Sequence, residues 1–175
     1  MYFFDLHCDT VFECERKGKE LLHNDLAISL EKARNFEKWV QAFAIFIHDK
    51  YSLQKQREQF FRQYALLKDQ MKKNDLAVFP ATDSRSRAVL KTIENASFIG
   101  SDFELIEKLA SDGFTLATLT WNAANCYAGG ADSPEGLTSL GKQAVKKFTE
   151  CGITIDVSHL SDISFWDVIK QLDKM

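Results

Sequence analysis

The run Val40-Gln41-Ala42-Phe43-Ala44-Ile45-Phe46-Ile47 contains a single polar residue. A strand that is covered on both faces has such a near-continuous apolar sequence, whereas a strand with one wet face alternates. Before it, Tyr2–Leu6 has the composition of a shorter strand. After it, Leu53–Lys73 is predicted to be a helix that Ser52 caps, because its apolar residues recur at spacings of four, three and four: Phe60, Tyr64, Leu67 and Met71.

The alternation of strands and helices continues along the chain. Four further segments are short and apolar, as strands are: Leu76–Phe79, Val89–Ile93, Phe114–Leu119 and Ile153–Val157. Three further helices are indicated. The first begins with the capping box Ser101-Asp102-Phe103-Glu104 and ends at Gly113. The second has the apolar stripe Leu140, Ala144, Phe148 and Cys151 and ends at Gly152, and the third begins after the capping residue Ser161. This order predicts a single α/β domain over residues 1–175 with a parallel sheet.

Composition excludes several classes of protein. The chain has 175 residues, of which 45% are hydrophobic and 27% charged, and its net charge is -3. Such a balance lacks a broad basic field, so we expect no nucleic-acid partner. No apolar stretch approaches the roughly 20 residues of a membrane helix, so we expect no membrane partner. Met1 leads directly into a strand-like segment instead of a signal peptide, which predicts a cytoplasmic protein.

Four cysteines, Cys8, Cys14, Cys126 and Cys151, form no C-x-x-C pair and no repeating spacing. The pattern therefore favours free, buried thiols over a disulfide framework or a thiolate zinc site.

Polar side chains follow the ends of several predicted strands. His7 and Asp9 are two residues apart at the end of the first strand, so on an extended chain they point to the same side. Glu94 immediately follows one strand, and His159 lies two residues past another. Because the carboxyl ends of parallel strands share one rim, which carries the active site in (β/α)8 barrels, we expect these side chains to converge. Nitrogen and oxygen ligands without thiolate suit zinc.

Each of these residues alone has a structural interpretation. Asp9 can cap a helix, Glu94 can be an acid in the first turn of a helix, and His159 can hold a structural hydrogen bond. A metal site is favoured only because all of these residues lie at the carboxyl ends of predicted strands. His23 and His48 show no such pattern, and we expect them to be structural or surface residues.

The chain resembles the membrane (renal) dipeptidase family of zinc peptidases. Asp5-Leu6-His7-Cys8-Asp9-Thr10 is similar to the opening motif of that family, and Ile93-Glu94 lies where the family has Ile-Glu-Gly. Three further segments match family motifs in order along nearly the whole chain: Leu119-Thr120-Trp121-Asn122 with Asn125, Gly136-Leu137-Thr138-Ser139-Leu140-Gly141, and Ile155-Asp156-Val157-Ser158-His159.

The resemblance implies a zinc-dependent dipeptidase built on the (β/α)8 TIM barrel of metal-dependent hydrolases. In the complete protein, two zinc ions would activate a bridging hydroxide that hydrolyses the peptide bond of dipeptides. The family pattern implies that His7 and Asp9 bind one zinc, that His159 binds the other, and that Glu94 bridges both as the catalytic carboxylate. It also implies a substrate-binding loop that carries Trp121, Asn122 and Asn125.

Two departures from the family pattern leave alternatives open. Many members have a histidine that faces the substrate where this chain has Trp121, whose indole N–H can donate but cannot act as an imidazole does. The sequence also accounts for only five or six of eight barrel strands, and the family's second ligand histidine, substrate-binding arginine and late aspartate have no counterpart in it. The expectation is a chain that is inactive alone and associates into homo-oligomers through open sheet edges. The alternative is a truncated, inactive barrel remnant with weak metal binding.

Overall fold

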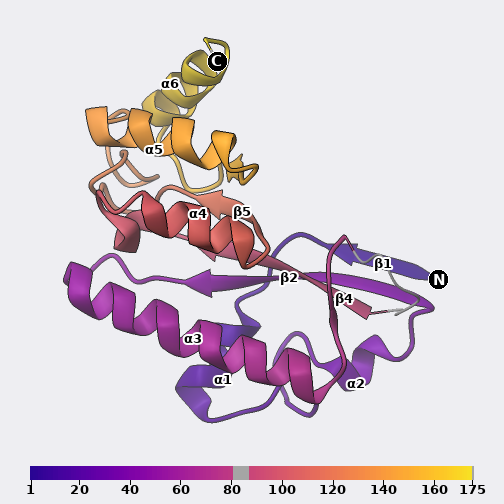
Figure 1. Ribbon diagram of the computed structural model, residues 1–175. Coiled ribbons are helices and arrows are strands. Elements are labelled where there is room, and N and C mark those ends of the chain that lie inside the picture. Colours follow the sequence, from indigo (N-terminus) through magenta and orange to yellow (C-terminus); the bar gives the residue numbers. More distant parts are fainter. Residues whose placement is uncertain (81–86, 175) are drawn as a thin grey trace. The chain divides into compact units, whose positions relative to one another are not determined.

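A computed structural model describes residues 1–80 and 87–174 (Figure 1). Its residue contacts divide the chain into two compact units. The first unit comprises Met1–Phe46 and Phe60–Thr92, and the second comprises Ile47–Gln59 and Ile93–Met175. The prediction of a single domain stays a prediction.

The first unit is built on parallel strands. The strand order is β1 (Tyr2–Asp5), β2 (Lys38–Phe46), β4 (Arg87–Glu94), and the short β3 (Ala77–Val78) pairs with β4. The β1–β2 and β3–β4 pairs are parallel, and Phe4 lies opposite Val40. Such pairs need crossover connections, which here contain the helices α1 (Thr10–Lys17), α2 (Leu30–Ala33) and α3 (Leu53–Lys73).

Strand β2 is the centre of the first unit's core. Its residues Ala42 to Ile45 are fully buried, which confirms the prediction of a strand covered on both faces. Helix α3 contributes the buried stripe that the spacing predicted, with Phe60 and Leu67 fully buried. Gln63 of the same helix donates to the carbonyl of Phe46 at 2.7 Å and accepts from its N–H at 3.1 Å. This pair of hydrogen bonds attaches α3 to the carboxyl end of β2.

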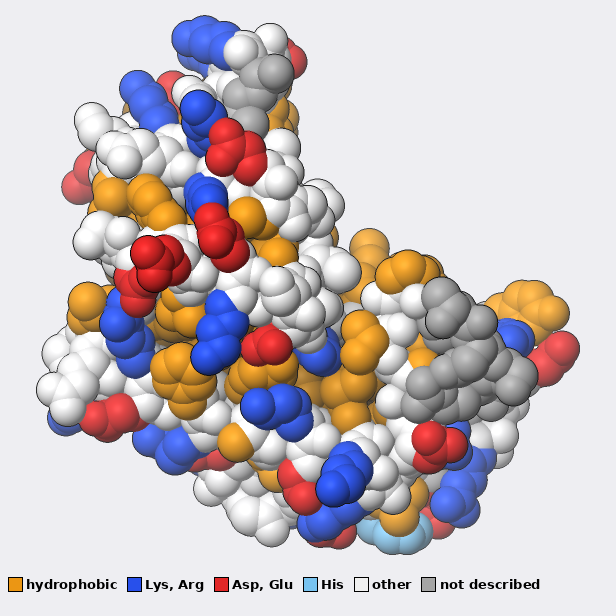
Figure 2. Space-filling view, in the orientation of Figure 1, with side chains coloured by type: hydrophobic (Ala, Val, Ile, Leu, Met, Phe, Trp, Pro, Cys, Tyr) orange, Lys and Arg blue, Asp and Glu red, His pale blue; other side chains and the backbone are white. Residues whose placement is uncertain are grey.

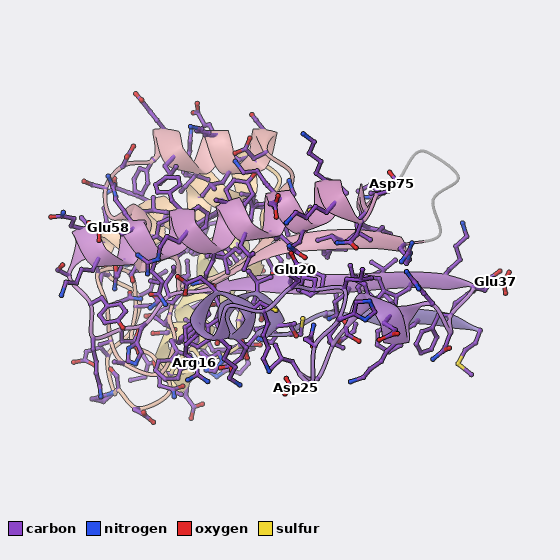
Figure 3. All side chains as sticks on the ribbon, turned by 90° about the horizontal axis from the view of Figure 1, so that it is seen from below. Arg16, Glu20, Asp25, Glu37, Glu58 and Asp75 are labelled. Atoms are coloured by element: carbon purple, nitrogen blue, oxygen red, sulfur yellow. The ribbon has the colours of Figure 1, made fainter. Side chains whose placement is uncertain are left out.

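The outer side of the first unit carries charged side chains, which Figure 3 labels at Arg16, Glu20 and Asp25. Arg16 pairs with Glu13 at 2.8 Å, and Glu20 with Lys73 at 3.2 Å. On the face drawn in Figure 2, basic and acidic side chains are interspersed. Exposed pairs of this kind contribute little to stability, so the apolar core carries the fold.

In the second unit the strand order is β4, β5 (Phe114–Thr118), β6 (Thr154–Asp156), because the last two residues of β4 belong to this unit. Strands β5 and β6 are parallel. Helix α4 (Glu104–Ser111) packs on β5, and α5 (Ser139–Glu150) packs on β6 and on α6 (Asp162–Leu172). A short 3-10 helix, η1 (Ala96–Ile99), follows β4 directly.

Most predicted elements are present, with ends shifted by one or two residues. Helix α3 has the predicted bounds, and Ser161 caps α6 by accepting from Ser164 N at 3.1 Å. Strand β4 is longer than predicted, so Glu94 is its last residue and does not follow it. The sequence analysis missed α1, α2 and η1, because elements of four to eight residues show too few turns for a period to emerge.

The predicted capping box at Ser101–Glu104 is wrong. The residue before α4 is Phe103, and no side chain caps this helix. The carboxylate of Asp102 accepts instead from the guanidinium of Arg57 at 3.2 Å. This contact joins the segment before α4 to a residue 45 positions earlier in the sequence.

All four cysteines are free, as predicted, but only Cys8 and Cys14 are buried, and Cys126 is exposed. Among the described residues, no helix combines the length and the apolar character that crossing a bilayer requires.

Candidate metal centre

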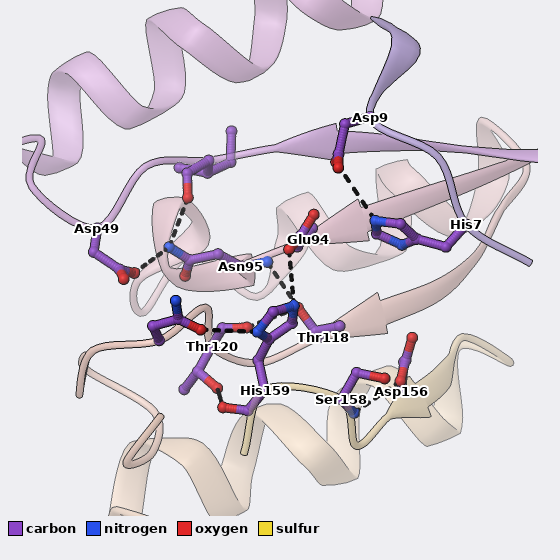
Figure 4. Close-up of polar contacts among 12 residues, drawn as sticks. His7, Asp9, Asp49, Glu94, Asn95, Thr118, Thr120, Asp156, Ser158 and His159 are labelled. Atoms are coloured by element: carbon purple, nitrogen blue, oxygen red, sulfur yellow. Dashed lines mark hydrogen bonds and ion pairs between the residues drawn. The ribbon is translucent and has the colours of Figure 1, made fainter. Parts of the chain in front are cut away.

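His7 and Asp9 lie in the turn between β1 and α1. Strand β1 ends at Asp5, so the two residues do not share a strand face as predicted. They are paired nevertheless, with His7 Nε2 3.4 Å from Asp9 Oδ1 (Figure 4). Asp9 occupies the N-cap position of α1 but makes no side-chain cap hydrogen bond. The capping interpretation of this carboxylate is therefore wrong, and it is directed to the imidazole.

Cys8, between the two, anchors this turn. Its carbonyl accepts from Ala44 N of β2 at 3.1 Å, so the backbone remains attached to the sheet after β1 has ended. Its side chain is buried, as predicted, and burial raises the pKa of the thiol well above its usual range.

Glu94 is a buried carboxylate at the carboxyl end of β4. It is only 4% exposed, and its Oε1 lies 3.1 Å from Nε2 of His159. Its backbone carbonyl accepts from Ile47 N at 3.1 Å, which ties the end of β4 to the residue after β2. A buried carboxylate is costly unless charged or polar groups compensate it, so its position in the core indicates a role.

The ring of His159 is held on both sides. Its Nδ1 lies 3.0 Å from Oδ1 of Asn122, while Nε2 faces Glu94 (Figure 4). Its backbone has a φ of 65°, in the left-handed region that few non-glycine residues adopt. The hydroxyl of Thr120 donates to its carbonyl at 3.0 Å, which holds this conformation. The loop after β5 thus positions both the backbone and the ring.

These contacts fit a divalent metal. An amide oxygen can only accept, so Asn122 fits a His159 that carries a proton on Nδ1, and in that form the lone pair of Nε2 would point toward the Glu94 carboxylate. Two acceptors at 3.1 Å repel unless a second proton or a cation compensates them. Two ligand atoms on one tetrahedral zinc are about 3.3 Å apart, close to the separations in the His7–Asp9 and Glu94–His159 pairs. The orienting amide is typical of metal-binding histidines.

Comparison with known families gives this geometry a context. The family described as membrane dipeptidase (Peptidase family M19) matches residues 1–173.

The chain belongs to this family.

Solved structures share the fold of this membrane dipeptidase family member. A metallopeptidase from Rhodobacter sphaeroides, liganded with a phosphinate mimic of the dipeptide L-Ala-D-Ala, matches 98% of this chain with a TM-score of 0.85 and 17% identity. A second metallopeptidase of the family, the dipeptidase AC, matches 98% of it with a TM-score of 0.83 and 18% identity. The probable dipeptidase PvdM from Pseudomonas aeruginosa also matches 98%, with a TM-score of 0.80 and 22% identity.

The chain spans 62%, 60% and 50% of the length of these three structures. Their likeness confirms the predicted α/β fold with a parallel sheet, as an incomplete barrel. The described residues contain six strands, within the predicted five or six.

The predicted substrate-loop residues have different surroundings. Asn122 is engaged with His159, as described above. Asn125 uses its side chain internally: it donates to Leu119 O at 2.9 Å and accepts from Tyr127 N at 2.8 Å. Trp121 packs its ring 5.4 Å from that of His48. Of the three, Asn125 is thus part of the framework of the loop.

Close packing shapes the same loop at Gly130. A Cβ atom at this position would lie 2.4 to 2.6 Å from the carbonyl oxygens of Trp121, Asn122 and Ala123. Only glycine allows this approach, which folds the loop back on the segment that bears Asn122.

Sequence reasoning missed two residues beside this site, Asp49 and Asn95. Asn95 is fully buried with a φ of 70°, and its amide donates to Asp49 Oδ1 at 2.8 Å. Both could have been found from the sequence, because each is a polar residue that follows a strand: Asp49 follows the end of β2, and Asn95 follows the end of β4. Functional residues of parallel sheets are common at these strand ends.

Proposed function

We propose that this protein is a zinc-dependent dipeptidase whose metal ligands are His7, Asp9, Glu94 and His159. Membership of the membrane dipeptidase family supports the reaction class. The observation that carries the site is the buried Glu94 carboxylate facing an oriented imidazole at 3.1 Å. The His7–Asp9 pair supplies the second half of the donor set.

Each ligand has a distinct task. Glu94 directs one carboxylate oxygen at His159, and a carboxylate has a second oxygen with which it can bridge to another cation. We propose that His7 and Asp9 would complete that other position, which would then have three protein ligands when Glu94 is counted. Bound zinc supplies Lewis acidity toward the scissile carbonyl and lowers the pKa of a water molecule. His159 and Glu94 alone hold the second position, so we expect weaker binding there.

A dipeptide has space beside this half of the site. A cavity of about 360 Å³ in the first unit borders His7 and Asp9, and Leu26, Ala27 and Ile28 form its apolar wall. An apolar dipeptide side chain fits such a wall. The indole N–H of Trp121 can donate to the substrate from the loop after β5, where many family members have an imidazole.

A zinc titration of the 175-residue chain tests the ligand set. We expect one tight and one weak site, with His7→Gln abolishing the tight site and His159→Gln the weak one. His23→Gln is the matched control, because His23 pairs with Glu31 at 2.9 Å and has no place in the proposed site. Elemental analysis after dialysis reports the zinc retained.

Three results would contradict the proposal: no zinc retained by the wild-type chain, two equally tight sites, or loss of zinc in His23→Gln. Zinc binding combined with no hydrolysis of L-Ala-D-Ala by the complete gene product would favour the inactive barrel remnant.

A further inference from the structure

Asp49 lies just past the end of β2 and joins two segments of the second unit. Its Oδ1 accepts from the side-chain amide of Asn95 at 2.8 Å (Figure 4). Its Oδ2 accepts from Ala123 N at 3.0 Å. Each oxygen of one carboxylate therefore receives a different donor. The two donors belong to segments that follow β4 and β5.

Each of these segments leads directly to one side of the His159 ring. Asn95 is the neighbour of Glu94, whose carboxylate faces Nε2 at 3.1 Å. Ala123 is the neighbour of Asn122, whose amide oxygen lies 3.0 Å from Nδ1. The Asp49 carboxylate thus connects the two supports of a single imidazole.

The Asn95 end of this connection is rigid. The Asn95 side chain is fully buried, donates to Ile47 O at 2.9 Å, and accepts from Asn125 at 3.0 Å. Its backbone N–H donates to Thr118 at 2.8 Å. The Ala123 end is exposed, and besides Asp49 its segment is held by a hydrogen bond from Asp132 N to Asn122 O at 2.8 Å and by close packing against Gly130. The loop segment at Asn122 is therefore the part that the Asp49 carboxylate stabilises.

We propose that Asp49 is a positioning residue of the metal centre: it holds the Asn122 segment so that Asn122 keeps the His159 ring in one tautomer, with Nε2 directed at the metal position. A carboxylate is required because the Asn95 amide and the Ala123 N–H both donate, and only a side chain with two acceptor oxygens can receive both. An asparagine at the same place would direct an NH2 group at one of the two donors. The metal part of this proposal rests on the proposed function, whereas the tautomer part does not.

The test uses the 15N-labelled 175-residue chain without metal, at a pH where its imidazoles are neutral. Histidine side-chain 15N spectra report the tautomer, and His159→Gln identifies the His159 signals. We expect one tautomer of His159 in the wild-type chain, fixed by its two neighbours, and a mixture of both tautomers in Asp49→Asn. Asp167→Asn is the matched control, because Asp167 also accepts from a loop N–H, that of Leu137 at 3.1 Å, outside the connection to His159.

Zinc affinity is the second measurement. We expect Asp49→Asn to weaken the site that contains His159 by about tenfold, as loss of groups that orient metal ligands does, and Asp167→Asn to leave it unchanged. A third measurement needs no variant: in the wild-type chain, the Ala123 N–H should exchange with solvent more slowly than that of the neighbouring exposed Ala124.

The outcomes separate the two proposals. An unchanged tautomer in folded Asp49→Asn, or equal exchange of Ala123 and Ala124, would overturn the role of Asp49. A wild-type chain that binds no zinc would overturn the proposed function and leave the tautomer comparison standing. If Asp49→Asn does not fold, the exchange of Ala123 decides.

Discussion

His159 and Asn95 share an uncommon backbone conformation at the candidate centre. Their φ angles are 65° and 70°, and Asp75 is the one other non-glycine residue with positive φ in the described chain. Such conformations cost about 1–3 kcal/mol and persist where surrounding contacts hold them. Here Thr120 holds the carbonyl of His159 and Thr118 the N–H of Asn95. One proposed ligand, His159, and the neighbour of another, Asn95, are therefore held in place at a cost to stability.

At this scale, the prediction is that Glu94→Gln removes zinc and activity without unfolding the chain. The change keeps the volume of the buried side chain but removes the charge that lets one group bind two cations. We expect kcat/KM of the complete gene product for L-Ala-D-Ala to fall by about 100-fold or more. Glu104→Gln, an exposed residue in the first turn of α4, is the control. Activity within a few-fold of wild type would show that Glu94 is no metal bridge.

Single hydrogen bonds decide where several elements start. The hydroxyl of Ser161 accepts from Ser164 N at 3.1 Å and donates to Glu135 O at 2.6 Å, so it starts α6 and attaches it to the loop after β5. Thr138 caps α5 in the same way by accepting from Gly141 N at 2.9 Å. Helix α4 lacks a side-chain cap and is attached through the Asp102–Arg57 pair.

Ser161→Ala is expected to lower the free energy of unfolding by about 1–2 kcal/mol, because it removes the cap and leaves the carbonyl of Glu135 with one donor fewer. Urea unfolding followed by circular dichroism measures the change. Ser139→Ala, at the first residue of α5 where Thr138 is the cap, should change stability little. Equal effects of the two substitutions would mean that the Ser161 hydroxyl contributes no more than an exposed serine.

At the scale of the whole molecule, β1 has an exposed apolar face. Tyr2, Phe4 and Leu6, at alternating positions, are 72%, 54% and 55% exposed. Strand β1 lies at one end of the strand order, so one of its edges has no neighbouring strand among the described residues. An exposed apolar face beside an open strand edge favours contact with another copy of the chain.

We therefore expect the purified chain to associate with itself at micromolar concentrations. The double substitution Tyr2→Thr with Phe4→Thr should shift it toward monomer, measured by light scattering after size exclusion. Ile163→Thr removes a side chain that is 53% exposed on α6 and is the control for a general loss of hydrophobicity. A wild-type chain that is monomeric over the whole concentration range would contradict this expectation.

The sequence by itself determined the α/β class, the helix Leu53–Lys73, the cap at Ser161 and the family, because these depend on local period, local hydrogen bonding and ordered motifs. It also singled out His7, Asp9, Glu94 and His159, since polar residues at the ends of apolar strands stand out.

The tertiary structure decided what no spacing encodes. Arg57 reached Asp102, 45 residues away, just before the uncapped helix α4. Asp49 reached Ala123, 74 residues away, and Asn122 reached His159, 37 residues away. Those partners meet only when the strands between them have paired, so folding alone sets the orientation of the His159 ring.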